Sequence, residues 1–410
     1  MTASDPERPR AAEPAPSLPP PRYIDSQESL LAWVERLEKA KVVAVDTESD
    51  SFHSYREKVC LVQMSADGVD VVIDPLAPLD LEPLRPLFAD ATRTKVFHDA
   101  GYDLMCLHRD YGFAVAGVFD TMVASRLLGN RVFGLAAILR DRFGFDADKR
   151  LQRSDWAQRP LSDAQISYAR FDTHFLERLM QMLSSELETA HRLAWAQEEF
   201  ARLPEAAVRA VERLASVNGD RFWRLKGVKA LASKARGRAR ALYELRDRIA
   251  ERLDRPAFKV FGDRVLLDLA ITPPHTLAEL GPRPGLQRGG VERFGREILV
   301  ALRQAAPLTE APPKGQGRRR AGRLLDPDAR ERYEVLRELR ARRAAELGIE
   351  GDVLLGNALL EDLAKRPPTT LDELRARDDL SGWRFELLGT HVLRELVAGT
   401  SAHGHSAVDA

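Results

Sequence analysis

The sequence has few cysteines, no net charge and no dedicated nucleophile motif, and each absence excludes a class of protein. Only two of its 410 residues are cysteines, Cys60 and Cys106. A cysteine-based zinc site is therefore excluded, and both thiols are expected to be free in a reducing compartment. The 62 basic residues balance 62 acidic ones, so a nucleic acid would have to be bound by a local basic patch. No His/Cys cluster, nucleophile elbow or phosphate-binding glycine loop is present.

Long apolar runs are also missing from the chain. No run approaches the length of about 20 residues that a membrane-spanning helix needs. The first residues contain Pro, Glu and Arg where a signal peptide would have an apolar core. We therefore expect a cytoplasmic protein with no membrane partner and, from its length, roughly two to three domains.

What the sequence does contain is a β-branched run that ends in a cluster of acids, KVVAVDTESD at residues 41–50. Alternate residues of a strand share one face, so Asp46 and Glu48 would lie side by side. Two adjacent carboxylates repel each other unless a cation lies between them, and hard divalent ions prefer such oxygen ligands. The alternative is a strand that runs into an ordinary acidic turn.

The surrounding pattern predicts a mixed sheet flanked by helices. Ser26 is placed to cap a helix that extends to about residue 39. Strand-like runs follow at 59–64 and 69–73, and the Asp67-Gly68 turn between them indicates antiparallel pairing. Another strand is expected at 95–98, and nearly all of the chain from there to about residue 203 is predicted to be helical. Such a pattern favours an α/β fold with helices packed on both faces of the sheet.

Further acids occur where they could join Asp46 and Glu48. Asp103 lies in the first turn of a helix expected to begin near residue 102, and its carboxylate could reach the edge of the sheet where Asp46 is expected. Asp99 is the rival candidate, although its position equally suits a helix cap. The segment SDAQ at 162–165 has the form of a capping box, which places Tyr168 and Asp172 on one face of the next helix. Pairs with this spacing are also common on solvated helix faces.

Other residues near these acids could contact a substrate or serve only the fold. His98 ends the strand at 95–98 and could contact substrate or be packed. Gln63 alternates with apolar neighbours and could face the cleft. Asp120, within an expected helical stretch, is interpreted as a cap or brace. Residues 221–250 hold ten Lys or Arg against two acids, and Trp223 lies among them. This stretch could bind phosphates, or it could be a solvated helix face.

An internal repeat occupies the second half of the chain. The pattern LAxxPPxTLxEL occurs at residues 269–280 and again at 363–374, at a constant offset of 94. The helices upstream match at a slightly shorter offset, so a small insertion separates the two copies. Beyond residue 204 no strand is expected, and the two copies are therefore predicted to be helical bundles.

The acids and their neighbours resemble the motifs of a known enzyme family. Asp46-x-Glu48, Asp103 and Tyr168-x-x-x-Asp172 together resemble the three exonuclease motifs of the DEDD superfamily, tyrosine subclass. The segments FHDAGYDL (97–104), FDT (119–121), SDW (154–156) and RPL (159–161) are similar to those of ribonuclease D. The similarity covers about residues 25–200. It implies a ribonuclease H-like fold and 3′→5′ exonucleolytic hydrolysis, and it favours Asp103 over Asp99. The repeated units resemble HRDC domains, helical bundles that in this family help to bind RNA.

This resemblance gives each site residue an expected role. Two divalent ions, Mg²⁺ or Mn²⁺, would lower the pKa of an attacking water and neutralise charge on the leaving 3′ oxygen. Asp46 would bridge both ions, Glu48 and Asp172 would hold the ion that carries the water, and Asp103 would hold the other largely through water. Tyr168 has an ordinary pKa near 10 and is therefore expected to orient the water by a hydrogen bond. His98, Gln63 and Trp223 are the candidate substrate contacts.

The expected organisation is a ribonuclease H-like exonuclease domain followed by two all-α HRDC-type bundles. The ranges are a disordered tail at 1–21, the exonuclease domain at 22–203, connecting helices and a first HRDC domain at 204–305, a basic Pro/Gly/Arg linker at 306–325, a second HRDC domain at 326–400 and a disordered tail at 401–410.

The expected activity is metal-dependent 3′→5′ hydrolysis of RNA to nucleoside 5′-monophosphates, by a monomer that acts on tRNA precursors with single-stranded 3′ ends. The alternatives are a single-strand DNA exonuclease and an inactive nucleic-acid-binding scaffold. The four mutually repelling carboxylates argue against the inactive scaffold, because such a protein has no physical reason to keep them.

Overall fold

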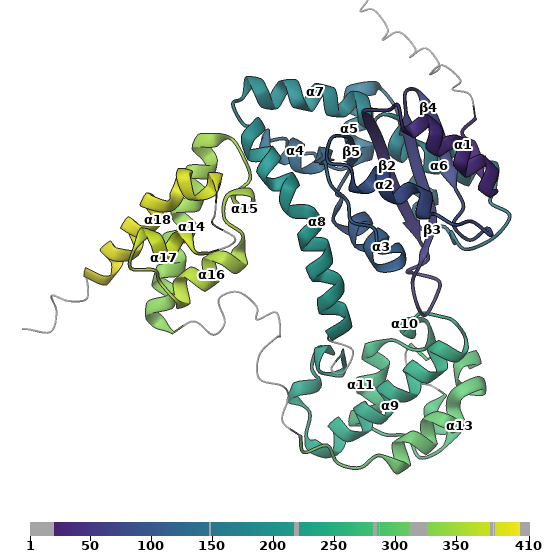
Figure 1. Cartoon of the computed structure of the whole chain (residues 1–410). Helices are drawn as coiled ribbons and strands as arrows, with labels where there is room; N and C mark the ends of the chain where they lie inside the picture. The colour runs from purple at the N-terminus through teal and green to yellow at the C-terminus, as the bar shows by residue number, and fades with distance from the viewer. Residues whose placement is uncertain are drawn as a thin grey trace, which may run out of the picture.

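The computed structural model describes residues 20–146, 149–216, 221–281, 285–286, 288–310, 326–377, 380 and 382–401. Most of the tails predicted at 1–21 and 401–410 and most of the predicted linker, residues 1–19, 311–325 and 402–410, lie outside the described residues. A sheet domain and two helical bundles make up the chain (Figure 1). Within the described ranges, no helix combines the length and the apolar character that a membrane span requires.

A mixed six-stranded sheet forms the centre of the first domain, as predicted. Its strands run in the order β1-β4-β3-β2-β5-β6. The pairs β2/β3 and β3/β4 are antiparallel, whereas β1/β4, β2/β5 and β5/β6 are parallel. The strands are β1 Arg22–Ile24, β2 Val42–Ser49, β3 Val59–Ala66, β4 Val69–Ile73, β5 Thr94–Phe97 and β6 Val118–Asp120.

Local turn chemistry explains the antiparallel start of the sheet. Asp67 and Gly68 connect β3 to β4 and both have positive φ, 47° and 72°. A two-residue hairpin with both central residues in this conformation matches the right-handed twist of the strands, which is why Asp-Gly is favoured there.

Two strands were not predicted. Strand β6 interrupts the region expected to be helical, so Asp120 ends a strand instead of lying inside a helix. Strand β1 lies at the opposite edge of the sheet, paired with β4. Each has only three residues, which is too short for a hydrophobic period to show in the sequence.

Helices cover both faces of the sheet. Helices α1 and α3 cover one face, where they pack in a hydrophobic core with Val43, Val45 and Phe97, while α6 and α7 cover the opposite face. Ser26 caps α1, as predicted. The helices of this domain are α1 Gln27–Leu37, α2 Arg85–Ala89, α3 Gly101–Tyr111, α4 Thr121–Leu127, α5 Leu135–Phe143, α6 Asp163–His174, α7 Leu176–Thr189 and α8 Leu193–Ser216, with short 3-10 turns at Glu82–Leu84 and Lys149–Leu151.

Helix α8 leaves the sheet domain and extends toward the first bundle (Figure 1). It passes through Pro204 without ending, so the predicted boundary between residues 203 and 204 falls inside a continuous helix. The first bundle contains α9 Ser233–Arg252, α10 Ala257–Val260, α11 Asp263–Ile271, α12 Leu277–Leu280 and α13 Arg288–Gln304, preceded by 3-10 turns at Arg221–Arg224 and Val228–Ala230. It has a hydrophobic core of its own.

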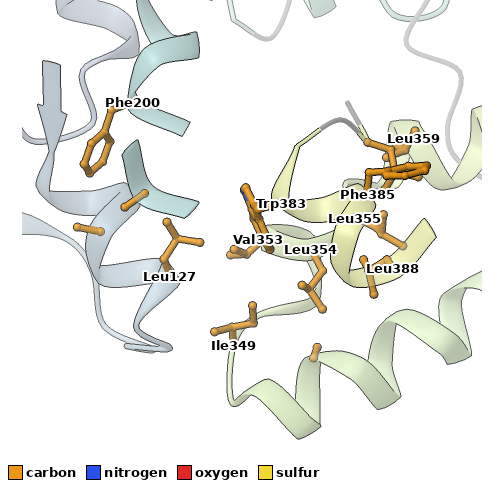
Figure 2. Packing of buried hydrophobic residues seen from close by; sticks show 14 of the residues in the cluster. Leu127, Phe200, Ile349, Val353, Leu354, Leu355, Leu359, Trp383, Phe385 and Leu388 are labelled. Atoms are coloured by element: carbon orange, nitrogen blue, oxygen red, sulfur yellow. The ribbon is translucent and has the colours of Figure 1, made fainter. Parts of the chain in front are cut away.

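The second bundle shares a hydrophobic core with the sheet domain. It contains α14 Pro327–Leu347, α15 Gly351–Leu354, α16 Asn357–Lys365, α17 Leu371–Arg375 and α18 Trp383–Ser401. Figure 2 shows Leu127 and Phe200 of the sheet domain on one side, with Ile349, Val353 and Trp383 of the bundle opposite them. The common core fixes this bundle against α4 and α8.

Candidate active site

Three carboxylates from distant parts of the sequence meet at the end of β2. Asp46 and Glu48 share one face of β2, and Asp172 comes from α6, which packs over that face. One carboxylate oxygen from each of the three residues lies within 4.8 Å of the others. Hence β2 and α6, more than 100 residues apart, form one acidic centre.

Helix α6 is held over the sheet by contacts at both of its ends. The predicted capping box is present, because Ser162 and Gln165 each bond to the backbone of the other. Near its C-terminal end, the Thr173 hydroxyl lies 2.7 Å from that of Ser65 on β3. His174 Nδ1 lies 2.8 Å from Asp70 Oδ2 on β4. These contacts fix where Asp172 projects.

Asp103 lies beside the three acids but outside their group. Its Oδ1 accepts hydrogen bonds from the backbone N–H of Thr47 (3.1 Å) and from the Thr47 hydroxyl (2.6 Å). The side chain of Asp103 is buried in the first turn of α3. Asp99, the rival candidate, is exposed in the turn before α3. The structure thus brings Asp103, and not Asp99, against the strand of the metal-ligand candidates.

Burial and mutual repulsion make all four acids hard to ionise together. Burial is the main cause of a raised pKa at Asp46, Glu48 and Asp103, and the neighbouring carboxylates add to it. Burial, followed by the charge of Asp103, raises the pKa of Asp172 to about 7. The Thr47 hydrogen bonds oppose the shift at Asp103. A cation among these oxygens would remove the repulsion.

The donor set suits a hard divalent cation. Mg²⁺ and Mn²⁺ prefer carboxylate oxygens, whereas softer metals prefer thiolate or imidazole ligands. Within the described part of the chain, the metal-capable group is made of carboxylates alone. The chemistry of the residues therefore fits a divalent metal centre.

Tyr168 lies one helical turn before Asp172 on α6. Its ring stacks on Trp156, with ring centroids 6.0 Å apart and an interplanar angle of 28°. Trp156 is almost fully buried, so it provides a firm support for the phenol ring. Tyr168 is half-buried, and its spacing on α6 directs it to the same side of the helix as Asp172.

Asp120 braces the backbone that carries Asp103. Its carboxylate accepts hydrogen bonds from the N–H groups of Met122 and Val123 in the first turn of α4. The same carboxylate accepts from Asp99 and Ala100, which lead into α3. The predicted capping role is confirmed, although the residue ends a strand.

Two predicted substrate contacts lie on or directly after the strands that flank β2. His98 follows β5, its Nδ1 is 2.8 Å from the Thr121 hydroxyl, and burial lowers its pKa to about 4. It is half-buried and neutral at physiological pH. Gln63 is the cross-strand partner of Asp46 but is fully buried, and neither of its amide atoms has a hydrogen-bond partner. The expectation that Gln63 faces the cleft is therefore corrected.

Trp223, the third predicted contact, belongs to the core of the first bundle. It is 6 % exposed and packs with Phe222 in that core. The expectation that Trp223 contacts substrate is therefore corrected, because its side chain is already packed in the core of the bundle.

Thr47 was not predicted as a site residue from the sequence. Its position between two metal-ligand candidates, on the opposite face of the strand, was the available signal.

The chain matches two known family profiles. Residues 21–188 match the profile described as "3'-5' exonuclease". Residues 235–302 and 329–396 each match the profile of the HRDC domain. The two HRDC matches cover the first and the second bundle, respectively.

The chain is also similar over nearly its whole length to named proteins. It is 32% identical to "Ribonuclease D" of Jannaschia sp. (strain CCS1), a match that covers 92% of this chain and 95% of that protein. It is 31% identical to "Ribonuclease D" of Gluconacetobacter diazotrophicus, covering 92% and 93%. Its fold is similar to the crystal structure of Escherichia coli RNase D, with a TM-score of 0.67 and 24% identity, covering 92% of this chain and 99% of that one.

Proposed function

This chain belongs to the ribonuclease D family and is a 3′→5′ exoribonuclease, and from that membership we propose that Asp46, Glu48, Asp103, Asp172 and Tyr168 form its catalytic centre. The observation that carries the proposal is the convergence of Asp46, Glu48 and Asp172 within 4.8 Å. No local feature of the sequence requires this convergence, since the residues come from two separate elements.

The four acids would hold two divalent cations, Mg²⁺ or Mn²⁺. When bound, such a pair supplies an acidified attacking water and neutralises charge on the leaving 3′ oxygen. Asp46 would bridge the pair, with Glu48 and Asp172 on one side and Asp103 on the other. The hydrogen bonds from Thr47 keep the Asp103 carboxylate turned toward β2.

Tyr168 would position the attacking water. An unperturbed tyrosine has a pKa near 10 and is a poor base at neutral pH, so the Tyr168 hydroxyl would act by hydrogen bonding. The stack on Trp156 limits the rotation of its ring. Release of nucleoside 5′-monophosphates follows if the water attacks the phosphate on the side away from the 3′ oxygen.

The substrate would be RNA with a single-stranded 3′ end, tRNA precursors among them. Supporting this is the basic segment at the start of the first bundle, where Arg221, Arg224, Lys226 and Lys229 are all exposed. Exposed Lys and Arg side chains bind phosphates without regard to sequence.

We also propose that the enzyme acts in the cytoplasm as a monomer. Cys60 and Cys106 are both free and buried, as expected in a reducing compartment. The apolar face of the second bundle packs within its own chain. Light scattering coupled to gel filtration would measure the oligomeric state directly, and a dimer would overturn this part of the proposal.

The Asp46→Asn variant tests the catalytic assignment. It keeps the size of the side chain and removes the bridging charge, so hydrolysis of a 3′-extended RNA should be lost while RNA binding is retained. Matched RNA and DNA oligonucleotides should be digested in parallel, with product release followed by chromatography. Undiminished cleavage by Asp46→Asn would refute the assignment.

A further inference from the structure

The two helical bundles can be compared residue by residue. The offset of 94 seen in the sequence relates α10 to α15, α11 to α16 and the first residue of α12 to that of α17. It also relates Asp254 to Gly348, and both have positive φ, 44° and 64°. The same face can therefore be identified on each bundle.

On the second bundle this face is docked against the sheet domain. Asp352 accepts a hydrogen bond from Arg126 at 2.7 Å. The ring of Trp383 stacks on Trp195 with centroids 4.6 Å apart. Ile349 and Val353 enter the shared hydrophobic core, where Figure 2 shows them turned toward Leu127.

On the first bundle the equivalent face is an open groove of about 490 Å³. All of its lining residues belong to the first bundle. The offset places a different kind of residue at each docking position. Arg255 occupies the position of Ile349, Phe258 that of Asp352, Lys259 that of Val353 and Gly289 that of Trp383. Gly290 occupies the position of Arg384, which pairs with Glu199 of α8. The docking residues are thus absent from this copy of the face.

The groove combines positive charge with an exposed aromatic ring. Arg255, Lys259 and Arg293 line it, and none of the described lining residues is an acid. In the ion pairs seen among the described residues, none of these three cations takes part. Phe258 is 55% exposed, whereas Trp383, on the docked face, is 6% exposed. Charge of one sign beside an exposed ring is the composition of a single-strand nucleic-acid surface.

The groove begins where the bundle contacts the loop that follows the metal-ligand strand. Asp254 accepts a hydrogen bond from the backbone N–H of Tyr55 at 3.1 Å, and Glu251 pairs with Arg56 at 3.1 Å. Leu253 and Arg255, on either side of Asp254, line the groove. Figure 1 shows this loop, between β2 and β3, reaching α10. Glu48 is the next-to-last residue of β2 and so lies just before this loop.

We propose that this groove is a subsite for single-stranded RNA, occupied by nucleotides upstream of the 3′ end being cleaved. Phe258 stacks on a base, and Arg255, Lys259 and Arg293 contact phosphates. The subsite rests on the proposed function, since it holds the strand whose end enters the acidic centre. The duplicated face has thus become an RNA contact in one copy and a domain-docking surface in the other.

Binding measurements on the full-length chain test the subsite separately from catalysis. In EDTA, which prevents hydrolysis, fluorescence anisotropy with a labelled oligoadenylate should give a Kd for Phe258→Ala that is about tenfold higher, the loss expected for one base–aromatic stack. Phe258→Trp should restore the affinity. Replacing Arg255, Lys259 and Arg293 with Ala should lower the slope of log Kd against log salt by about 0.7 per lost phosphate contact, the value for single strands.

Ile271→Ala is the matched control, because Ile271 is equally exposed on the same bundle, at 56%, but does not line the groove. It should bind the oligoadenylate as the parent does. A Kd for Phe258→Ala equal to that of the control would overturn the subsite. Failure of Asp46→Asn to abolish cleavage would overturn the catalytic proposal and leave the binding result standing.

Photo-crosslinking identifies the occupant directly. An RNA containing 4-thiouridine should crosslink to the peptide that contains Phe258, and the crosslink should be lost in Phe258→Ala. If the peptide instead crosslinks to a segment of the sheet domain under a protein–protein reagent and RNA gives no crosslink, the face is a second docking surface and the RNA subsite is wrong.

Discussion

Thr47 and Asp103 are joined by two hydrogen bonds, from the backbone N–H and the hydroxyl of Thr47 to a single carboxylate oxygen of Asp103. Thr47 lies between the two acids of β2, and its side chain points to the other face of the strand. The same strand therefore supplies two metal-ligand candidates on one face and holds a third acid from the other.

Removing the Thr47 hydroxyl should weaken the metal centre without unfolding it. Thr47→Val keeps the β-branched shape and loses the 2.6 Å hydrogen bond. Loss of a partner that orients a metal ligand costs about 10- to 100-fold in metal affinity or activity. Titration of activity with Mn²⁺ measures the effect. Thr47→Ser, which keeps the hydroxyl, should behave nearly as the parent, and an equal loss in both variants would contradict this role.

Tyr168→Phe should lower kcat with little change in KM. The phenylalanine ring can keep the stack on Trp156, so only the hydroxyl that we propose to position the water is lost. A loss on the order of 100-fold is expected for a misplaced nucleophile. Steady-state kinetics on a short RNA would measure it, with Tyr111→Phe, distant from the acids, as the control. A rise in KM at constant kcat would indicate a substrate contact instead.

Asp172→Asn should stabilise the metal-free protein. Burial and the charge of Asp103 raise the pKa of Asp172 to about 7, so removing its charge relieves repulsion among the acids. We expect the Tm in EDTA to rise by about 2–4 °C, as for roughly 1 kcal/mol in a domain of this size.

The same variant should lose the increase in Tm that Mn²⁺ gives the parent, because a ligand stabilises only the state that binds it. Asp163→Asn, an exposed change on the same helix, should keep that increase. An undiminished Mn²⁺ effect in Asp172→Asn would exclude it as a ligand.

Glu199 of α8 forms an ion pair with Arg384 of α18 in the second bundle. The docking of this bundle should therefore depend on the pH at which Glu199 is ionised. Burial raises the pKa of Glu199, but the hydrogen bonds and charge of Arg384 outweigh it and hold the pKa below its usual value. The unfolded chain then binds the proton more tightly. The contribution of Glu199 to the stability of the folded protein is complete above about pH 4.3, the pKa of a glutamate in the unfolded chain. This contribution is lost as the pH falls through the lower pKa that Glu199 has in the folded protein.

Glu199→Gln should therefore lower the free energy of unfolding by about 2 kcal/mol at neutral pH, the usual size for hydrogen bonds to a charged group. The difference from the parent should shrink below about pH 4.3. Thermal unfolding across this range measures it. Glu205→Gln, whose partner Arg209 is on the same helix and whose side chain is 74% exposed, should change stability by less than about 0.5 kcal/mol. A difference that persists in acid would refute the assignment to Glu199.

Features that depend on a few neighbouring residues were predictable from the sequence. The cap at Ser26, the turn at Asp67-Gly68 and the capping box at Ser162 are all present. Each depends on hydrogen bonds or φ values within three or four residues. Asp46, Glu48 and Asp172 could also be proposed as site residues in advance, because their spacing on a strand and a helix is itself a local property.

Features that depend on residues far apart were not predictable in the same way. Strands β1 and β6 exist because the sheet offers them a partner. Trp223 faces a core that its own segment does not specify. The apolar residues of α15 could equally have faced a core within their own bundle.

The sequence by itself determined which side chains could carry the chemistry and where most of the longer helices and strands lie, because these depend on periodicity and local hydrogen bonding. Only the tertiary structure decided that Asp172 meets Asp46, that Thr47 holds Asp103, and that one copy of a duplicated face is docked while the other is open. These outcomes are set by packing between segments separated by tens to hundreds of residues, and such contacts leave no period in the chain.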